Sequence, residues 1–356
     1  MKQTEVHSLK NKSSNLILAA GICLFAALSV FSQAFASGVS RGLEFCANLL
    51  IPSVFPFLIA AVLTGMGTLP ESLCKIISPF TERVFGLPAQ CAPVIALSQV
   101  GGYLSGAKSV HSLYSCGIIS EKTAERMLLF CINAGMGFSV NAIGSGMLDS
   151  RQAGKVIFAS LCISSLINGI TSRFFIKDGT DSRQSHPRVR RSISSAVTES
   201  VSSGGAAMIN ACIFTVAFSG VGAIFDKYIA HGPAKKFVSC LLEVTKGCSD
   251  ISGIASLPVI AAVCGFGGLC VHVQIFSVTN DIKINLPRFY LFRVLNSVTA
   301  YAVCRLILYF HPVTVPVSLV INPPAAVFSF SAPAAISLLF LCALLILDLD
   351  NGEKIC

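Results

Sequence analysis

The chain has 356 residues, of which 53% are hydrophobic and only 12% are charged, and its formal net charge is +9. Soluble domains carry roughly 25% charged residues, so this composition excludes a soluble enzyme, a nucleic-acid-binding domain and a disordered chain. It predicts an all-α protein that crosses the cell membrane several times in contact with lipid, oriented by the Lys and Arg residues in its loops.

The cysteines and the known motifs point to no cofactor chemistry. The 15 cysteines include no C-x-x-C pair, and several lie in apolar segments, which favours small buried apolar residues over a zinc site or a disulfide framework. The sequence contains no HExxH, GxSxG or Walker A motif. We therefore expect no metal, no cofactor and no enzyme activity.

Two apolar segments open the chain. The first, Leu16–Phe35, follows three lysines and is long enough for a membrane anchor. Its end, Ala34–Ala36, also resembles a signal-peptidase site. We favour a retained anchor because the second segment, Gly42–Met66, follows at once. Pro52 and Pro56 lie inside this second segment and should kink it.

Cys91–Cys116 is apolar at both ends but is interrupted by glycines at its centre. Gly101, Gly102 and Gly106 are accompanied by polar side chains, which is too polar a pattern for an uninterrupted span. Two half-helices that meet at a glycine turn fit this pattern better. The segment is therefore predicted to be a re-entrant hairpin, which enters the bilayer and returns.

Two spans and a long charged loop follow. Glu121–Met147 is predicted to be a span with Ser120 as its N-cap, and Gln152–Phe175 is the next span. Lys177–Glu199 is rich in arginine and divides the chain into two halves. Val201–Phe225 then begins the second half as a further span.

A second glycine-broken segment, Ile254–Asn280, mirrors the first. Gly265, Gly267 and Gly268 interrupt it, and a second re-entrant hairpin is predicted here. The last predicted spans are Leu286–Phe310 and Ala332–Leu347.

The two halves share the order of span, glycine-broken hairpin and span. An offset of 163 residues places Gly102 on Gly265 and Asn133 on Asn296. If Lys177–Glu199 is cytoplasmic, the halves form inverted repeats, whose hairpins face each other from opposite leaflets. Four lysines of the second half would then lie outside, against this orientation: Lys227, Lys235, Lys236 and Lys246.

The broken helices and their polar neighbours form the candidate binding site. Half-helix ends expose unpaired N–H and C=O groups that can bind a polar ligand, although glycines also simply allow close helix packing. The candidate residues are Gln99, Gly101, Gly102, Tyr103, Ser105, Lys108, Asn133, Glu243, Gly265, Gly267, Gly268, His272, Gln274 and Asn296.

Several of these residues also have a purely structural interpretation. Lys108 can extend to the interface, and His272 can be a buried histidine with its hydrogen bonds satisfied. Asn133 and Asn296 can bind a ligand or bridge two helices. Glu243 can couple a proton or an ion to solute movement, or cap the next helical turn.

Five motifs resemble those of the YlbJ-type sporulation integral membrane proteins, which are grouped with the nucleoside recognition (Gate) domain proteins. They extend over most of the chain and are Gly42–Phe57 (GLEFCANLLIPSVFPF), Gly102–Ala107 (GYLSGA), Tyr114–Ser120 (YSCGIIS), Leu241–Gly247 (LLEVTKG) and Gly265–Gln274 (GFGGLCVHVQ). Leu104 departs from the family pattern, which has proline there and a stiffer hairpin turn.

The resemblance implies a fold similar to the core of the concentrative nucleoside transporters and a role in forming the endospore. We expect binding or transport of a small polar, nucleoside-like metabolite between the two hairpins. The alternative is a scaffold or assembly factor of the spore envelope that transports nothing. The expected parts are an N-terminal transmembrane anchor (1–37), a first Gate-like repeat (38–176), a basic cytoplasmic linker (177–199), a second Gate-like repeat (200–310) and a C-terminal transmembrane helix with its tail (311–356).

Overall fold

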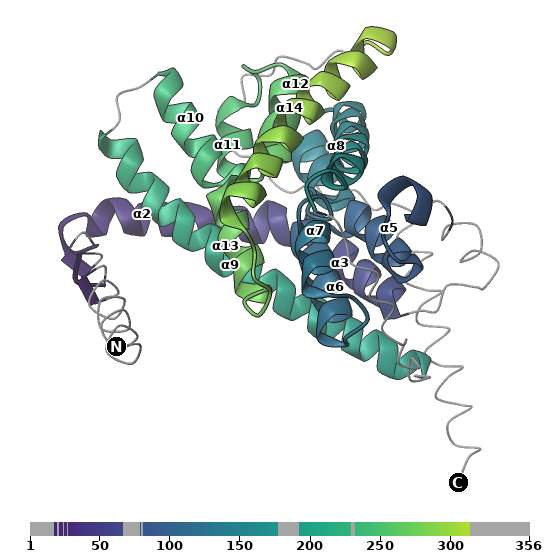
Figure 1. The fold of residues 1–356 in the computed structure, drawn as a ribbon. Coiled ribbons are helices and arrows are strands. Elements are labelled where there is room, and N and C mark those ends of the chain that lie inside the picture. Colours follow the sequence, from purple (N-terminus) through teal and green to yellow (C-terminus); the bar gives the residue numbers. More distant parts are fainter. Residues whose placement is uncertain are drawn as a thin grey trace, which may run out of the picture.

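The computed structural model describes residues 18–313 except 20, 24, 27, 67–78, 80, 177–191 and 229–231. Every regular element in these residues is a helix (Figure 1), which confirms the predicted all-α class. Five helical segments in this part are long and apolar enough to cross a membrane, which agrees with a multi-pass membrane protein: Ser32–Leu63, Arg151–Ser172, Ile193–Lys227, Leu257–Val278 and Leu286–Phe310. The predicted span Ala332–Leu347 lies outside the described residues.

The first of these segments is one long helix. It consists of α2 (Ser32–Phe45), a π-helical turn (Cys46–Leu50) and α3 (Ile51–Met66). It therefore begins at Ser32, ahead of the predicted start at Gly42. The π-helical turn directly precedes Pro52, which has no N–H to continue the regular α-helical ladder.

Helix α9 (Ile193–Tyr228) lies along this long helix and runs antiparallel to it (Figure 1). Glycines bring the two backbones together, because a Cβ at Gly38 would lie only 2.4 Å from the Ser219 carbonyl oxygen. Near the other end of the pair, Gly204 of α9 packs on Ile59. Small residues at such contacts let helices pack closely in a membrane, where no hydrophobic force drives them together.

Both glycine-rich segments contain a broken helix. α5 (Ala92–Gly101) and α6 (Tyr103–Ser115) meet at Gly102, whose φ is +90°. These two helices pack on each other. α12 (Leu257–Phe266) and α13 (Gly268–Val278) meet at Gly267, whose φ is +92°.

The two halves of the second broken helix have different main neighbours. α12 packs chiefly on α14 (Leu286–Phe310) and on α8 (Arg151–Ser172), whereas α13 packs on α6 and α9. Leu257–Val278 is also long enough as a whole to cross the membrane. The break at Gly102 therefore joins two helices that pack on each other, whereas the break at Gly267 joins two helices with different main neighbours.

A further pair of short helices, which the sequence left unassigned, lies between α9 and α12. α10 (Pro233–Leu242) and α11 (Val244–Ile251) pack on each other and meet at Glu243. Their contact is close, because a Cβ at Gly247 would lie 2.5 Å from Cys240 Cα. Glu243 thus lies at the tip of a helical hairpin.

The prediction of one continuous helix over Glu121–Met147 is wrong. α7 (Glu121–Leu128) does begin at the predicted Ser120 cap, whose hydroxyl accepts the Thr123 N–H at 3.3 Å. The chain is then non-helical over Ile132–Gly135, and a π-helix follows over Gly137–Met147. The unwound stretch is fully buried, so its backbone groups need partners from elsewhere.

Contacts between α7 and α14 do not confirm the predicted inversion of the repeats. The Glu121 carboxylate accepts the Lys283 N–H at 3.0 Å, and Glu125 pairs with Arg288, its equivalent at the 163-residue offset, also at 3.0 Å. Further along both helices, Arg293 donates to the carbonyls of Leu129 and Ile132. Equivalent helices thus run in parallel, with their first residues at the same end of the molecule.

α6 and α13 show the same direction. Tyr103, at the start of α6, contacts Gly267 at the start of α13, and His111 pairs with Asp281 beyond the end of α13 at 3.0 Å. Among the compared segments, only the long helix α2–α3 and α9 run antiparallel. The orientation of the repeats in the membrane was predicted partly from loop charge. Two of the lysines that disagreed with it, Lys235 and Lys246, form ion pairs with acidic side chains of the fold.

Candidate functional site

A cavity of about 80 Å³ lies at the centre of the described structure. α3, α6, α9 and α13 contribute to its wall, together with the Gly102 break, the unwound stretch at Gly135 and the Glu243 tip. Most of the lining is aliphatic or aromatic. Five of the predicted site residues are in the wall, namely Gly101, Gly102, Tyr103, Glu243 and Gln274.

The Gly102 break is open to this cavity. α5 ends at Gly101, and no side chain in the described residues donates a hydrogen bond to the carbonyl oxygens of Val100 and Gly101. Both residues line the cavity. The break can be this tight because the backbones of Gly102 and Gly135 are in contact, and a Cβ at Gly135 would lie 2.6 Å from the Gly102 nitrogen. Only glycine fits there.

The break at Gly267 is closed by side chains. Tyr103 Oη donates to the Cys264 carbonyl at 2.6 Å, and Asn296 Nδ2 donates to the Gly265 carbonyl at 2.9 Å. The Phe266 carbonyl accepts from His272 Nε2 at 2.9 Å. The last turn of α12 therefore has a donor for each of these three carbonyls. The predicted residues Gly265, Gly267, Gly268, His272 and Asn296 are not in the cavity wall.

His272 is packed as a structural residue. It is fully buried, and its ring meets those of Phe266, Phe289 and Tyr290 edge-on, with centroids 5.0 to 5.4 Å apart. Nδ1 has no hydrogen-bond partner among the described residues. The side chain ties the end of α12 to the start of α14.

The two equivalent asparagines bridge helices through α8. Asn133 Nδ2 donates to Gln99 Oε1 at 3.3 Å, and Gln99 Nε2 donates to Ser165 Oγ at 3.1 Å. Asn296 Oδ1 accepts from Ser164 Oγ and from Asn168 Nδ2, each at 2.8 Å. Helix α8 thus supplies neighbouring serines to the two halves of the protein. On one side they link α8 to α5 and the unwound stretch, and on the other side they link α8 to α14 and α12.

Two predicted residues of α6 also lie outside the cavity wall. Ser105 is buried against Gly101, whose added Cβ would lie 2.5 Å from Ser105 Oγ. Lys108 is half-buried further along the helix. Both side chains therefore have surroundings other than the cavity.

Glu243 is a buried carboxylate at the tip of the α10–α11 hairpin. Its side chain caps α11, because Oε1 accepts the Thr245 N–H at 2.8 Å and Oε2 accepts the Lys246 N–H at 2.6 Å. The predicted capping role is therefore confirmed, but the residue is only 3% exposed and also lines the cavity. It lies outside the five candidate spans. Burial raises the pKa of the Glu243 carboxyl, although hydrogen bonds from the Thr245 side chain and from the two backbone N–H groups oppose this shift.

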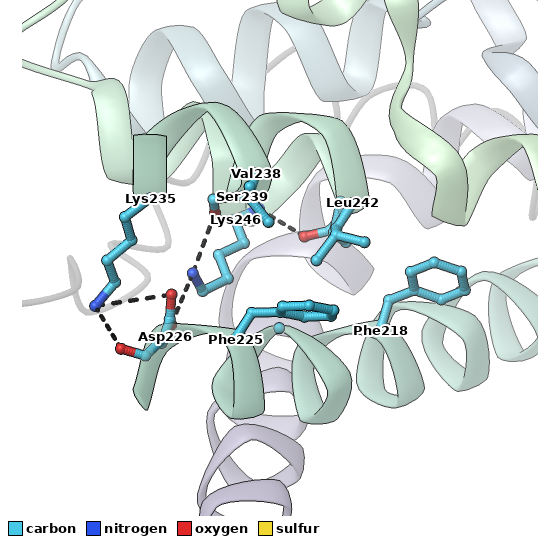
Figure 2. Close-up of a pocket in the computed structure, with 10 residues that line it drawn as sticks. Phe218, Phe225, Asp226, Lys235, Val238, Ser239, Leu242 and Lys246 are labelled. Carbon is cyan, nitrogen blue, oxygen red and sulfur yellow. Dashed lines mark hydrogen bonds and ion pairs between the residues drawn. The ribbon is translucent and has the colours of Figure 1, made fainter. Parts of the chain in front are cut away.

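The lysine next to this carboxylate is bound elsewhere. Figure 2 shows Lys246 between α9 and α10, where its Nζ lies 3.0 Å from Asp226 and 2.9 Å from Asp250. Ser239 Oγ accepts a third hydrogen bond from it at 3.1 Å. Lys235 adds a longer contact of 3.8 Å to Asp226. This charged cluster fastens the base of the hairpin to α9.

Two buried arginines complete the interior, and the sequence analysis did not select them. Arg293 donates to the carbonyls of Leu129 and Ile132 at 2.6 and 2.8 Å, so it replaces the helical N–H groups that the unwound stretch lacks. Arg126 donates to the carbonyls of Phe85 and Gly86. A signal was available for Arg293, because an ionisable residue within an apolar span such as Leu286–Phe310 usually has a role.

These features define a class: an all-α, multi-pass protein of the cell membrane with a small, mostly apolar central cavity. Within this class, the chain is similar to the sporulation integral membrane protein YlbJ of Bacillus subtilis (strain 168). The two are 24% identical over 331 aligned residues, which cover 80% of this chain and 81% of that protein. No family model matches the chain, and no solved structure matches it. The similarity supports the YlbJ-like family that the motifs indicated, whereas the nucleoside recognition domain stays a prediction.

Proposed function

We propose that this protein acts in endospore formation, as a YlbJ-like membrane protein that binds a small polar solute in its central cavity and moves it across the membrane. The sporulation role is supported by the similarity to YlbJ, whose name records it. The solute-binding role is supported by the cavity itself. No step in this role requires catalysis.

One observation carries the solute-binding role: the cavity wall contains a buried carboxylate, Glu243, that has no ion-pair partner in the described residues. A buried charge without a partner is unfavourable, so Glu243 favours an occupant that supplies hydrogen-bond donors or positive charge. The end of α5, where Val100 and Gly101 also line the cavity, can add carbonyl oxygens to the same site.

The size of the cavity limits the solute. Pockets for drug-sized ligands are roughly 300–1,000 Å³, whereas this cavity measures about 80 Å³. We therefore propose a smaller solute, and nucleoside uptake becomes one arm of the test.

We also propose that the re-entrant elements are α5–α6 and α10–α11. These helices have 8 to 13 residues each, and at about 1.5 Å per residue each is far shorter than the roughly 30 Å of a bilayer core. Leu257–Val278 instead crosses, in place of the second predicted hairpin. Single cysteines in a cysteine-free background test this arrangement, at Gln90 and Ser115 on either side of α5–α6 and at Ser256 and Asp281 on either side of Leu257–Val278. Labelling of the first pair from one side of the membrane and of the second pair from opposite sides supports it, and any other result contradicts it.

Proteoliposome assays test the transport role. Purified protein is tested for binding and uptake of labelled amino acids, small amines and nucleosides. Gln274→Leu removes a polar group from the cavity wall, and Gln152→Leu makes the same change at an exposed position of α8. We expect uptake that is lost in the first variant and kept in the second. Equal signals from both variants and from empty vesicles would remove the transport role.

The closed break at Gly267 favours a second candidate, a scaffold of the spore envelope. Tyr103, His272 and Asn296 form hydrogen bonds with backbone carbonyls of the protein, as polar residues of a purely structural core do. A scaffold predicts that Gln274→Leu supports normal numbers of heat-resistant spores in a B. subtilis strain that lacks YlbJ. It also predicts that changes at Arg188 to Arg191 abolish this rescue.

A further inference from the structure

The wall of the central cavity contains a single charged side chain, Glu243. Each of its oxygens accepts one backbone N–H, from Thr245 and Lys246. The Thr245 side chain adds a third hydrogen bond. A carboxylate offers about four acceptor sites, so about one of them is left for the cavity. The residue is held rigidly by its capping role, which makes its charge a fixed feature of the wall.

No side chain neutralises this charge directly. In the described part of the chain, no Lys, Arg or His nitrogen is within ion-pair distance of Glu243, and the ammonium group of Lys246 is taken by Asp226 and Asp250. The guanidinium of Arg293 donates to two backbone carbonyls. A buried, unpaired carboxylate is unfavourable, so it attracts a cation or a proton from solution.

The rest of the polar lining offers oxygen atoms that could coordinate a cation. The carbonyls of Val100 and Gly101 lie at the C-terminal end of α5, where the helix dipole is negative. Thr215 contributes a hydroxyl, and Gln274 contributes its amide oxygen, because its Nε2 donates to Cys270 Sγ. Such a set of oxygens with one carboxylate suits a hard cation of low charge.

We propose that the central cavity binds one monovalent cation, an alkali metal ion or a small ammonium, between the Glu243 carboxylate and the carbonyl oxygens at the end of α5. The proposal deepens the solute-binding role by naming the charge that the site accepts. The cavity of about 80 Å³ has room for such an ion with a few water molecules. A divalent ion usually needs more carboxylates, and no group of three acidic, His or Cys residues in the described structure is suited to hold one.

The site should respond to pH through Glu243. The titratable groups around this carboxylate are Lys246 and Cys248 of α11, Tyr103 of α6, Cys270 of α13 and Cys46 of the π-helical turn. Protonation of Glu243 removes the negative charge that a cation needs. Cation binding and proton binding therefore compete.

Thermal unfolding of the full-length protein in detergent tests the proposal without any solute. The midpoint is measured in NaCl, KCl and methylammonium chloride, against N-methylglucamine chloride at equal ionic strength. We expect a saturable increase of several degrees with at least one of the small cations. The sodium, potassium and methylammonium arms distinguish a metal ion from an ammonium.

Matched variants locate the effect. Glu243→Gln should abolish the cation-dependent shift, whereas Glu82→Gln, at an exposed position, should keep it. If Glu243→Gln does not fold, Thr215→Val still tests the site, because it leaves the α11 cap intact and should raise the half-saturating cation concentration several-fold. A shift that survives both cavity variants, or that N-methylglucamine reproduces, overturns the proposal. An unfolding midpoint that depends on pH but on none of the cations also overturns the proposal, because the site then binds only a proton. The assay contains no transported solute, so it tests cation binding even if the transport assays are negative.

Discussion

The two glycine breaks share a positive φ but differ in ψ and in their surroundings. Gly102 has φ +90° and ψ 179°, whereas Gly267 has φ +92° and ψ −16°. At Gly267 the preceding carbonyls accept from Tyr103, Asn296 and His272. At Gly102 the preceding residues line the cavity, and no side chain in the described residues donates to their carbonyls.

The comparison shows that a broken helix is not in itself a binding site. What matters is whether neighbouring elements supply donors to the freed carbonyls. Tyr103 illustrates the difference, since it begins the helix after the open break while its hydroxyl closes the other one. Tyr103 therefore caps the break at Gly267 and leaves the break at Gly102 without a side-chain donor.

The largest effect is expected where a buried donor supports two backbone groups. Arg293→Met leaves the carbonyls of Leu129 and Ile132 unpaired, at about 1–3 kcal/mol each. We expect the free energy of unfolding to fall by about 2–5 kcal/mol. Arg288→Met, on the same helix, removes only the partly exposed pair with Glu125 and should cost less than about 1 kcal/mol. Denaturant unfolding of both variants measures the difference, and equal losses would contradict the capping role of Arg293.

Opening the closed break should cost less. Asn296→Ala removes the donor to the Gly265 carbonyl and leaves Ser164 and Asn168 without their shared acceptor. The expected loss of stability is about 1–3 kcal/mol, with cation response unchanged. Thermal unfolding with and without NaCl measures both quantities. A lost cation response would mean that the closed break also contributes to the site.

Alanine at the two glycines sharpens the contrast between stability and binding. Gly267→Ala places a side chain in the left-handed region, at about 1–2 kcal/mol, whereas Gly102→Ala forces alanine into a region of φ and ψ that essentially only glycine adopts. The loss of stability should therefore be larger for Gly102→Ala. Only Gly102→Ala should also weaken cation or solute binding, because only Gly102 lines the cavity. Titrations of both variants would show this, and equal binding defects would contradict the distinction.

The smallest expected effect is a pH dependence. The pKa of Glu243 is raised in the folded protein, so the stability contributed by its protonated form is lost as pH rises through that pKa. A cation replaces the proton on the carboxylate, so its stabilisation should grow over the same pH range. Unfolding midpoints with and without NaCl from pH 5 to pH 8 measure this trend, which should be absent in Glu243→Gln.

Local features of the fold followed from the sequence. Leu286–Phe310 is a helix with the predicted bounds, Ser120 caps α7, and the helices break within the predicted glycine clusters. These features depend on hydropathy, capping and glycine conformation, which neighbouring residues determine. The sequence also placed Gly101, Gly102 and Glu243 together in one site.

Features that depend on distant contacts did not follow. The predicted inversion of the repeats is not confirmed, because α7 and α14 run in parallel whereas the long helix α2–α3 and α9 run antiparallel. The unwound stretch Ile132–Gly135 depends on Arg293, which lies far away in the chain. The sequence does not distinguish whether His272 and Asn296 donate to a ligand or to a backbone carbonyl, because both partners accept the hydrogen bond through an oxygen atom.

Arg293 has a mechanical consequence. Its guanidinium fastens α14 to the carbonyls of Leu129 and Ile132, and the same stretch of backbone continues to Gly135 in the wall of the cavity. A small rotation or slide of α14 would therefore pull on the chamber directly, without passing through flexible side chains. Movement of α14 is therefore coupled to the shape of the space where the ligand would lie.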